Sequence, residues 1–507
     1  MTSVEPSSSA RARHAKLGLS IDGQDQVKRG LLWLGSATLA ARVLDLTATV
    51  VIVSLLTKEE MGLAALPISA CAILESLSGI GIGSALVQAK DLSAKEESSL
   101  FWLTSAVGGA LGLILLGLAP ILAMTYGEVK LGPLVAVSSL KLALVGVGVV
   151  PQQLLSKRLE FRELGTVQTL SSLGEGAVKI VLALAGAGAW SLVIGNVARG
   201  FVLLIALWVL SSFRPQLHFA LHETKRFVRF GLQVAGSGVL YSLYKNADYF
   251  LVGKLISIEA LGLYRVAFDV AMQPTDTIIA VVGRVGFPVY SRLSHDLAAL
   301  RATFTSNTRS LFLMVAPLAA LIFMSAPHLF ALVAEGRWLG AAPAVQVLVW
   351  AGLLRAATTM FPQVYVALGK PAYATVDSLL TLVVLTAAFW GGLTWFPEVG
   401  VLSVCYAWLF IYPVFLLGHL LVIRRLIGLA QGAYWRALAA GFGPVPPMAL
   451  GLYVLGRLTD GRGLGLLELP LMIVVGLSIY WAYLRWVLSV RFADLVPKRT
   501  RPTPSGE

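Results

Sequence analysis

The sequence predicts an all-α, polytopic membrane protein with about fourteen transmembrane helices. Composition gives the first reason, because 57% of the 507 residues are hydrophobic and only 13% are charged, whereas soluble proteins contain roughly 25% charged residues. Run length gives the second, because the apolar residues occur in stretches of about 20, enough to cross a bilayer. The polar segments between these stretches are short, so no sizeable soluble domain is expected.

The apolar runs define the predicted spans in chain order, each with an error of a few residues at either end. They lie at 30–56, 61–88, 100–123, 131–155, 165–186, 189–212, 229–256, 260–288, 306–333, 342–368, 372–395, 399–423, 434–456 and 466–489.

Positive charge is distributed unevenly between these spans. The formal net charge is +13, and most of the Lys and Arg residues fall in the two tails and in alternate loops, with few on the other side, such as Lys58, Lys130 and Lys254. Cytoplasmic loops retain Lys and Arg in membrane proteins. The pattern predicts that both termini are cytoplasmic. Membrane topology thus accounts for the net positive charge, and no nucleic-acid partner is expected.

A short motif recurs at an offset of two hundred residues. The segment 57–63 reads TKEEMGL and the segment 257–263 reads SIEALGL, and both join two spans. Leu55, Glu59, Gly62, Leu63 and Gly83 recur as Leu255, Glu259, Gly262, Leu263 and Gly283. Thr57 and Glu60 also have the spacing of a helix capping box. Internal repeats are common in transporters, so we predict two homologous six-helix lobes around a central cavity.

The repeat predicts the following organisation. We expect a cytoplasmic tail at 1–27, an N-lobe of spans one to six at 28–212, a cytoplasmic loop between the lobes at 213–228, a C-lobe of spans seven to twelve at 229–425, two further spans at 426–489 and a cytoplasmic tail at 490–507. The two extra helices are expected either to pack beside a lobe or to form part of a lipid-facing groove.

Ionisable residues within the spans indicate the site. Each costs roughly 2.5–3.5 kcal/mol near the bilayer centre on insertion scales, so such residues face a cavity or pair with one another. The candidate substrate-binding residues are Arg42, Lys141, Lys179, Arg199, Lys245, Arg284 and Arg355. The candidates for ion pairing or ion coupling are Asp45, Glu75, Glu175, Asp248, Arg265 and Asp269.

Spacing along the helices predicts some pairs and leaves other cations without a local partner. Residues three or four apart share a helix face, which predicts the pairs Arg42/Asp45, Glu175/Lys179, Lys245/Asp248 and Arg265/Asp269. Lys141, Arg199, Arg284 and Arg355 have no such acid on their own helices. The charges could be structural locks, or they could line a cavity with surplus positive charge. A cationic cavity suits an anionic cargo, because guanidinium groups bind phosphate through paired hydrogen bonds.

Motifs for enzymatic and metal chemistry are absent from the sequence. It contains no HExxH, GxSxG, P-loop or CxxC motif, and the histidines at 328 and 419 stand apart from other such residues in the sequence. Cys71 and Cys405 are too far apart in the chain to indicate a disulfide framework or a thiolate site. We therefore expect no enzyme activity, no metal and no cofactor, while coupling to an ion gradient stays open, with the ion unknown.

An ordered set of short motifs resembles the Wzx-type polysaccharide flippases, and most closely the colanic-acid and teichuronic-acid exporters. The longest is GSALVQAKDLSAKEESSLFW at 83–102. The others are RLEF at 158–161, DYFLVG at 248–253, LGLY at 261–264, FP at 287–288, GRW at 336–338 and LGKP at 368–371.

The resemblance implies the fold of the multidrug/oligosaccharidyl-lipid/polysaccharide exporters and a location in the bacterial inner membrane. It further implies that undecaprenyl-pyrophosphate-linked oligosaccharide repeat units are flipped by alternating access for exopolysaccharide, capsule or O-antigen synthesis, with polymerase or export proteins as partners. The alternatives are a drug/cation antiporter of the same fold and a non-transporting scaffold of a polysaccharide synthase complex. A lipid II flippase fits the ordered motifs less well.

Overall fold

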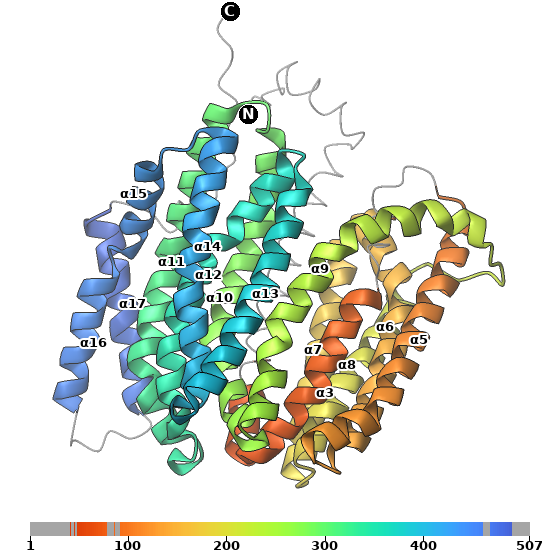
Figure 1. Cartoon of the computed structure of the whole chain (residues 1–507), viewed down its shortest axis with the longest axis horizontal. Coiled ribbons are helices and arrows are strands. Elements are labelled where there is room, and N and C mark those ends of the chain that lie inside the picture. Colours follow the sequence, from red (N-terminus) through yellow and green to blue (C-terminus); the bar gives the residue numbers. More distant parts are fainter. Residues whose placement is uncertain are drawn as a thin grey trace, which may run out of the picture. The chain divides into compact units, whose positions relative to one another are not determined.

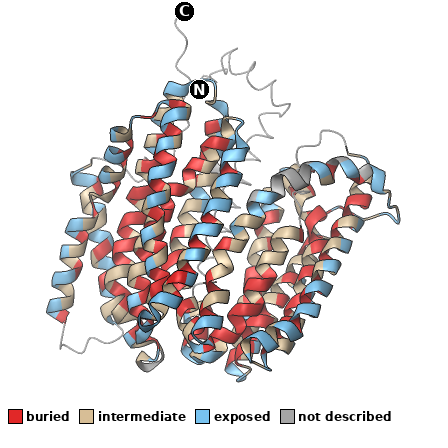
Figure 2. Cartoon of the chain, in the orientation of Figure 1, coloured by how far each residue is buried: buried red, intermediate tan, exposed pale blue. Residues whose placement is uncertain are grey.

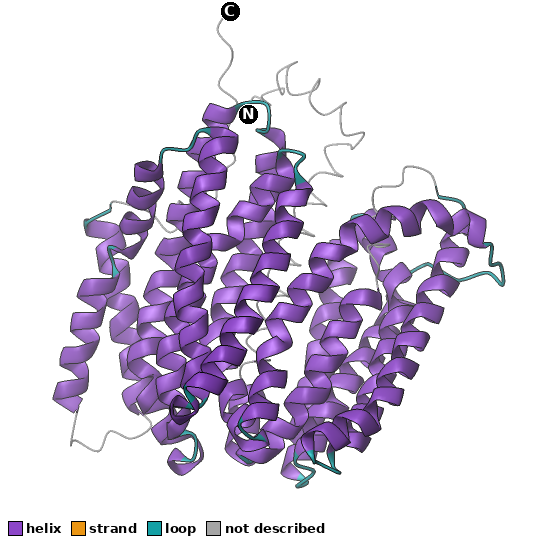
Figure 3. Ribbon diagram, viewed as in Figure 1, coloured by secondary structure: helices purple, strands orange, loops and turns teal. Residues whose placement is uncertain are grey.

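The computed structural model describes residues 41, 45, 48–78, 86, 92–459 and 467–488. Within these ranges, only the backbone is described at 223, 226, 230–235, 237, 284, 285, 334 and 335. The described part of the chain is built from helices joined by short loops and contains no strand (Figure 3).

Two compact units make up the chain. Unit 1 comprises residues 1–56 and 66–239, and unit 2 comprises 57–65 and 240–507. Helices α3 (Lys58–Ser78) and α9 (Leu221–Leu255) contribute to both. Unit 1 also contains α5 (Ala94–Tyr126), α6 (Leu131–Lys157), α7 (Phe161–Leu184) and α8 (Ala189–Leu210). The predicted lobe and tail boundaries stay a prediction.

Unit 2 contains the remaining helices, which are labelled in Figure 1. They are α10 (Ile258–Arg292), α11 (Leu297–Leu332), α12 (Ala342–Ala367), α13 (Pro371–Trp395), α14 (Val401–Ile427), α15 (Gln431–Phe442), α16 (Val445–Thr459) and α17 (Glu468–Trp486). Short 3-10 turns lie at Val333–Gly336, Leu339–Ala341 and Pro397–Val399.

The helices confirm the polytopic membrane fold. Among the described residues, 12 helical segments are long and apolar enough to span a membrane. The predicted span at 229–256 corresponds to α9, which is a helix but is not among those 12 segments. The span at 434–456 is built from α15 and α16 in succession. The predicted span at 30–56 begins outside the described residues.

Exposed apolar side chains mark the surfaces that lipid would cover. On α13, Val376, Leu380, Val383 and Trp390 are all more than half exposed. Figure 2 shows such pale exposed turns along the helices, with the buried residues toward the interior of each bundle. Extended apolar surfaces of this kind are rare on soluble monomers and are expected for helices that face acyl chains.

Within unit 1, two glycines bring helices α5 and α6 into backbone contact. A Cβ atom added at Gly108 would lie 2.6 Å from the Leu142 carbonyl oxygen, and one added at Gly146 would lie 2.6 Å from the Thr104 carbonyl oxygen. Small residues at helix crossings are the usual device for close packing within membranes. The paired glycines therefore fix the α5–α6 crossing.

The repeated corner forms a second glycine crossing, and this one lies inside unit 2. A Cβ atom at Gly62 would lie 1.9 Å from the Ile258 carbonyl oxygen, and one at Gly262 would lie 1.8 Å from the Lys58 carbonyl oxygen. Lys58 Nζ and Glu259 Oε1 are 3.4 Å apart across the same crossing. The two copies of the motif, predicted as equivalent corners, thus start α3 and α10 and pack against each other.

Hydrogen bonds at the starts of these helices confirm the predicted capping box. The Thr57 backbone N–H donates to Glu60 Oε2 at 2.8 Å, and the Glu60 N–H donates to Thr57 Oγ1 at 3.2 Å. In the second copy, the Ala260 N–H donates to Ser257 Oγ at 3.0 Å. Such caps satisfy the free amides of a first helical turn, so both corners have a sharply defined start.

The last three helices pack on α11 at one edge of unit 2 (Figure 1). A Cβ atom at Gly441 would lie 2.3 Å from Phe312 Cβ, and one at Gly476 would lie 3.3 Å from the Leu321 side chain. Thr459 and Glu468, at the ends of α16 and α17, are joined by a hydrogen bond of 2.9 Å. The sequence left open whether these helices pack beside a lobe or form part of a lipid-facing groove. In the structure they pack on α11 of unit 2.

Candidate functional site

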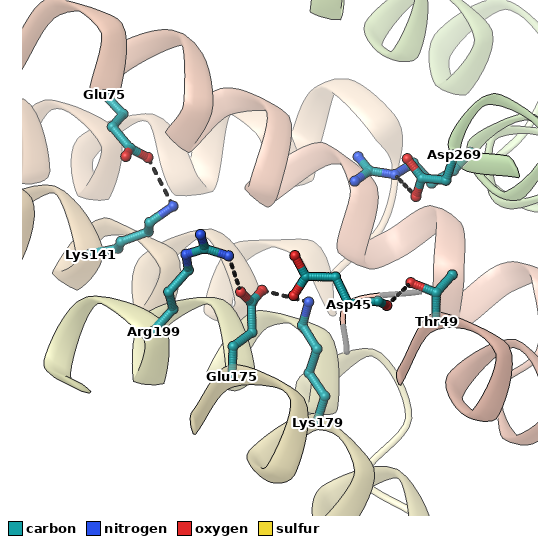
Figure 4. A network of polar contacts seen from close by, with 9 residues as sticks. Asp45, Thr49, Glu75, Lys141, Glu175, Lys179, Arg199 and Asp269 are labelled. Carbon is teal, nitrogen blue, oxygen red and sulfur yellow. Dashed lines mark hydrogen bonds and ion pairs between the residues drawn. The ribbon is translucent and has the colours of Figure 1, made fainter. Parts of the chain in front are cut away.

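Unit 1 contains a group of buried and half-buried charges contributed by four helices, shown in Figure 4. Glu175 Oε1 on α7 lies 2.6 Å from Lys179 Nζ on the same helix, and Glu175 Oε2 lies 2.8 Å from Arg199 Nη1 on α8. Lys141 Nζ on α6 lies 2.8 Å from Glu75 Oε2 on α3. Each cation is therefore held by an acid, which lowers the energy of burying both.

Electrostatic interactions join these pairs into one group. Arg199 also interacts with Asp45 and Glu75, and Lys141 interacts with Glu175. Among the described residues, Lys141, Lys179 and Arg199 thus face Asp45, Glu75 and Glu175, three charges of each sign. The group is close to electrically neutral in this arrangement.

Glycine 195 makes room for one member of the group. A Cβ atom at this position would lie 2.3 Å from Lys179 Cγ and 3.2 Å from Lys179 Cε. The lysine stem therefore lies against the backbone of α8, and this places its ammonium group beside Glu175. A lone glycine in an apolar helix gives no sequence signal for such a role.

Unit 2 contains a second charged group, in which one acid is shared by two cations. Asp276 on α10 forms an ion pair with Lys245 on α9, with 3.1 Å between Oδ2 and Nζ, and its other oxygen pairs with Arg355 on α12. The Arg355 side chain is only 6% exposed, whereas those of Lys245 and Asp276 are 33% and 28% exposed. With two cations and one acid, the three side chains have a net charge of +1.

Tyrosines surround this second group. The Lys245 ammonium lies 5.8 Å from the centre of the Tyr241 ring, and Tyr241 and Tyr244 form an edge-to-face pair. Arg355 interacts electrostatically with both rings and with Tyr412. Arg355 Nε and the Tyr412 hydroxyl are buried without a hydrogen-bond partner among the described residues. Unpaired buried polar atoms are rare and call for an explanation.

Two further candidates on α10 form a local ion pair. Arg265 Nε donates to Asp269 Oδ2 at 2.8 Å, one helical turn away, and the guanidinium lies 5.2 Å from the centre of the Tyr249 ring. This confirms the predicted pair, as does the contact between Glu175 and Lys179.

The predicted pair of Lys245 with Asp248 is wrong. Lys245 contacts Asp276, and Asp248 instead accepts hydrogen bonds from the Tyr264 hydroxyl at 2.6 Å and from Trp408 Nε1 at 3.3 Å. The Tyr249 backbone N–H donates to its other oxygen at 2.9 Å. Asp248 therefore contacts Tyr264 near the start of α10 and Trp408 on α14, whereas Lys245 contacts Asp276 further along α10.

Lys141, Arg199 and Arg355 have no acid partner one turn away on their own helices, as the sequence shows, but the structure supplies each with one from elsewhere. Each pairs with an acid on a neighbouring helix, which spacing along a single helix does not reveal. Arg42 lies outside the described residues, as does the side chain of Arg284. The predicted pair of Arg42 with Asp45 stays a prediction.

The fully buried Asp248 is expected to stabilise unit 2. Replacing it with alanine would leave the hydroxyl of Tyr264 and the indole N–H of Trp408 without their acceptor, and each hydrogen bond to a charged group contributes about 1.5–3 kcal/mol. We expect Asp248→Ala to destabilise the purified protein by about 3 kcal/mol or more, measured by thermal unfolding in detergent. The control is Asp296→Ala, which removes an exposed helix cap worth about 1 kcal/mol. Equal unfolding temperatures for the two variants would contradict this role.

Histidine 419 was predicted to stand apart, and the structure corrects this. Its Nε2 atom lies 3.1 Å from Asp377 Oδ1, and its Nδ1 atom lies 2.9 Å from the Tyr365 hydroxyl. Likewise, His328 Nε2 lies 3.3 Å from Glu468 Oε1. These partners come from helices distant in sequence, so no spacing rule could have found them.

Long apolar helices that bury paired charges within their spans are the architecture of a multi-pass membrane protein. The chain also matches the polysaccharide biosynthesis protein family over residues 51–343, more than half of its length, and it belongs to that family.

Individual relatives and solved structures agree with this assignment. The chain is 27% identical to the teichuronic acid biosynthesis protein TuaB of Bacillus subtilis, over 65% of this chain and 69% of that protein. It is 24% identical to the lipopolysaccharide biosynthesis protein WzxC of Escherichia coli, over 64% and 67%. Its fold resembles that of the lipid II flippase MurJ, with a TM-score of 0.71 and 13% identity, over 90% of this chain and 100% of MurJ.

Proposed function

We propose that the protein flips undecaprenyl-pyrophosphate-linked oligosaccharide repeat units across the bacterial inner membrane, with both of its termini in the cytoplasm. Family membership and the resemblance to polysaccharide exporters support a lipid-linked sugar as cargo. The fold shared with MurJ supports a transporter and does not decide between lipid-linked substrates. The proposal includes no chemical reaction, and polymerase or export proteins are the expected partners.

The main structural support for the proposal is the charged group around Asp276 in unit 2. It combines a surplus positive charge with a buried guanidinium whose Nε has no partner among the described residues. A pyrophosphate would accept hydrogen bonds from Arg355 and Lys245 in place of Asp276, and charge-assisted hydrogen bonds of this kind are strong and directional. The rings of Tyr241 and Tyr244 are suited to stacking against a sugar.

The charged group of unit 1 has a different role in this proposal. Because its described charges balance, an anion could be bound there only if an acid released its cation, for example Glu75 releasing Lys141. Glu75 and Arg199, whose side chains are 35% and 37% exposed, are the members best placed for such an exchange. We infer that this group rearranges its ion pairs during transport. Arg42 and Arg284 remain candidate substrate-binding residues from the sequence.

Depletion of the protein in cells that depend on it tests this function. We expect lipid-linked repeat units to accumulate in the inner membrane with their sugars accessible only from the cytoplasmic side, as detected by enzymatic labelling of sealed vesicles of either orientation. Supplying a Lys58→Gln/Glu259→Gln variant should restore normal labelling, because exposed ion pairs contribute little to stability. Repeat units that reach the outer side at an unchanged rate during depletion would overturn the proposal and favour a scaffold role.

A further inference from the structure

The loop between α8 and α9 exposes apolar side chains that the proposed transport path does not use. Leu217 is 96% exposed, Phe219 is 54% exposed, and Leu221, the first residue of α9, is 65% exposed. All three lie in the segment 213–228, which the sequence predicts to be a loop outside the membrane spans. Three large apolar side chains exposed within five residues form a patch, and such patches mark interaction sites.

Hydrogen bonds to α5 hold this loop in a fixed shape. The Gln216 backbone N–H donates to Ser98 Oγ at 3.0 Å, and the Ala220 N–H donates to Ser99 Oγ at 3.2 Å. The Trp102 indole N–H donates to the Gln216 carbonyl oxygen at 2.9 Å. The apolar side chains between these attachment points are therefore presented by a fixed backbone.

Aromatic side chains on either side of the loop pack inward. Phe213 and Phe227 belong to a buried cluster with Phe101 of α5, and the ring centres of Phe101 and Phe213 are 5.7 Å apart. On the first turns of α9, Phe227 is buried while Lys225 and Arg229 are exposed. Figure 1 shows these turns at the same end of unit 1 as the start of α5. The inward positions near the loop are thus already filled by other residues.

The corner between α6 and α7 adds another exposed apolar side chain at this end of unit 1. Arg158 Nη1 donates to Ser212 Oγ, which joins the corner to the loop. Leu159 has a φ of 60°, in the left-handed region, and it is 42% exposed. Leucine rarely adopts this conformation, and strained residues cluster at functional positions. We therefore group Leu159 with the exposed apolar side chains of the loop.

Positive charge borders these apolar side chains. The segments 93–102, 157–163 and 211–229 contain eight Lys and Arg residues and five Asp and Glu residues, a net charge of +3. The exposed cations of the last two segments are Arg158, Arg162, Arg214, Lys225 and Arg229. An apolar patch with a cationic rim is complementary to a membrane surface, where anionic headgroups lie above acyl chains.

The lipid-facing side of α8 leads directly to the loop. Phe201, Ile205 and Val209 follow one face of this helix and are 48%, 61% and 74% exposed. The helix ends at Leu210, and the loop begins at the next residue, so the loop lies where acyl chains give way to headgroups. Trp102, which is hydrogen-bonded to the loop, is 37% exposed, and tryptophan is enriched at this depth of the membrane.

We propose that Leu159, Leu217, Phe219 and Leu221, with the cations around them, form a surface that docks on anionic phospholipids. The apolar side chains enter the upper acyl region, and the cations contact lipid phosphates. The leaflet is the one at this end of unit 1, which the charge distribution predicts to be cytoplasmic. A protein partner is less favoured because of the depth of the loop. The proposal concerns a surface rather than a cargo, so it stands independently of the proposed function.

Depth measurement by electron paramagnetic resonance tests the docking. A nitroxide would be attached to the Leu217→Cys protein in vesicles of phosphatidylglycerol and phosphatidylcholine, and the native Cys71 and Cys405 are buried. We expect the label to respond more to oxygen, which dissolves among acyl chains, than to a water-soluble nickel complex.

The control for depth is the same label on His295→Cys, in the exposed polar corner between α10 and α11. It should respond more to the nickel complex than to oxygen. Equal access of the nickel complex to the two labels would overturn the docking and leave the surface to a protein partner.

Thermal unfolding in lipid nanodiscs tests the preference for anionic headgroups. We expect phosphatidylglycerol to raise the unfolding temperature by a few degrees over phosphatidylcholine alone, because a ligand that binds the folded state stabilises it. Arg162→Gln/Lys225→Gln should lose most of this rise. Lys130→Gln/Lys254→Gln, which neutralises two exposed cations outside the surface, should retain it. Equal rises in the two variants, or no rise in the wild-type protein, would overturn the recognition of anionic lipid.

Discussion

Replacing Arg355 with alanine is expected to lower the rate of headgroup translocation by about ten- to a hundredfold. This follows from the loss of one charge-assisted hydrogen bond to the cargo, which contributes about 1.5–3 kcal/mol. The measurement is the initial rate of translocation in proteoliposomes containing equal amounts of folded protein. Arg355→Lys should retain part of the rate, because lysine keeps the charge but lacks the forked geometry of the guanidinium.

A neutral double variant separates this role from a structural one. Arg355 is buried against Asp276, so removing Asp276 alone leaves the buried guanidinium without its acid, which is strongly destabilising. Removing Arg355 alone leaves Asp276 paired with Lys245. In Asp276→Asn/Arg355→Gln both charges are removed, and we expect a folded protein that does not transport. The matched control, Lys58→Gln/Glu259→Gln, neutralises an exposed pair in the same unit. A double variant that transports at the wild-type rate would mean that the pair acts only as a structural lock.

Replacing Gly262 with valine is expected to prevent accumulation of folded protein, and alanine should already lower the unfolding temperature by several degrees. An added Cβ atom would lie 1.8 Å from the Lys58 carbonyl oxygen and 2.9 Å from the Gly62 nitrogen. These are backbone atoms, so the starts of α3 and α10 would have to separate. Protein abundance in membranes and thermal unfolding in detergent measure the effect.

The control for this crossing is Gly117→Ala, since a Cβ atom there would meet nothing within 4 Å. It should stabilise the protein by up to about 1 kcal/mol, because alanine is favoured over glycine within helices. Gly62→Ala should lower the free energy of unfolding about as much as Gly262→Ala. The double variant should lower it by less than the sum of the two single effects, because both added Cβ atoms force the same separation of α3 and α10. Equal stabilities for Gly262→Ala and Gly117→Ala would contradict the close contact.

The sequence predicted most of the fold because membrane spans depend on local composition. Apolar runs located the helices, and the repeated corner located two equivalent helix starts, at Lys58 and Ile258. The capping residues at Thr57 and Glu60 were also visible locally. The contact between the two corners was not predicted, since glycines in a repeat do not reveal what they pack against.

The charged groups were predicted only where the partners share a helix. Glu175 with Lys179 and Arg265 with Asp269 follow from a separation of four residues. The pairing of Arg355 with Asp276 joins residues far apart in the chain, and the acceptor role of Asp248 depends on Trp408, 160 residues later. Tertiary packing decides such contacts, so the predicted cationic surplus was overstated where acids from neighbouring helices neutralise the cations.

Translocation of a lipid-linked headgroup by the purified protein tests the central claim most directly. Proteoliposomes would contain an undecaprenyl-pyrophosphate oligosaccharide, with a cationic dye as a second cargo in parallel vesicles. We predict that the oligosaccharide crosses at a rate that depends on Arg355 and that the dye does not cross. Dye transport without lipid translocation would contradict the account and assign the chain to the antiporters that share its fold.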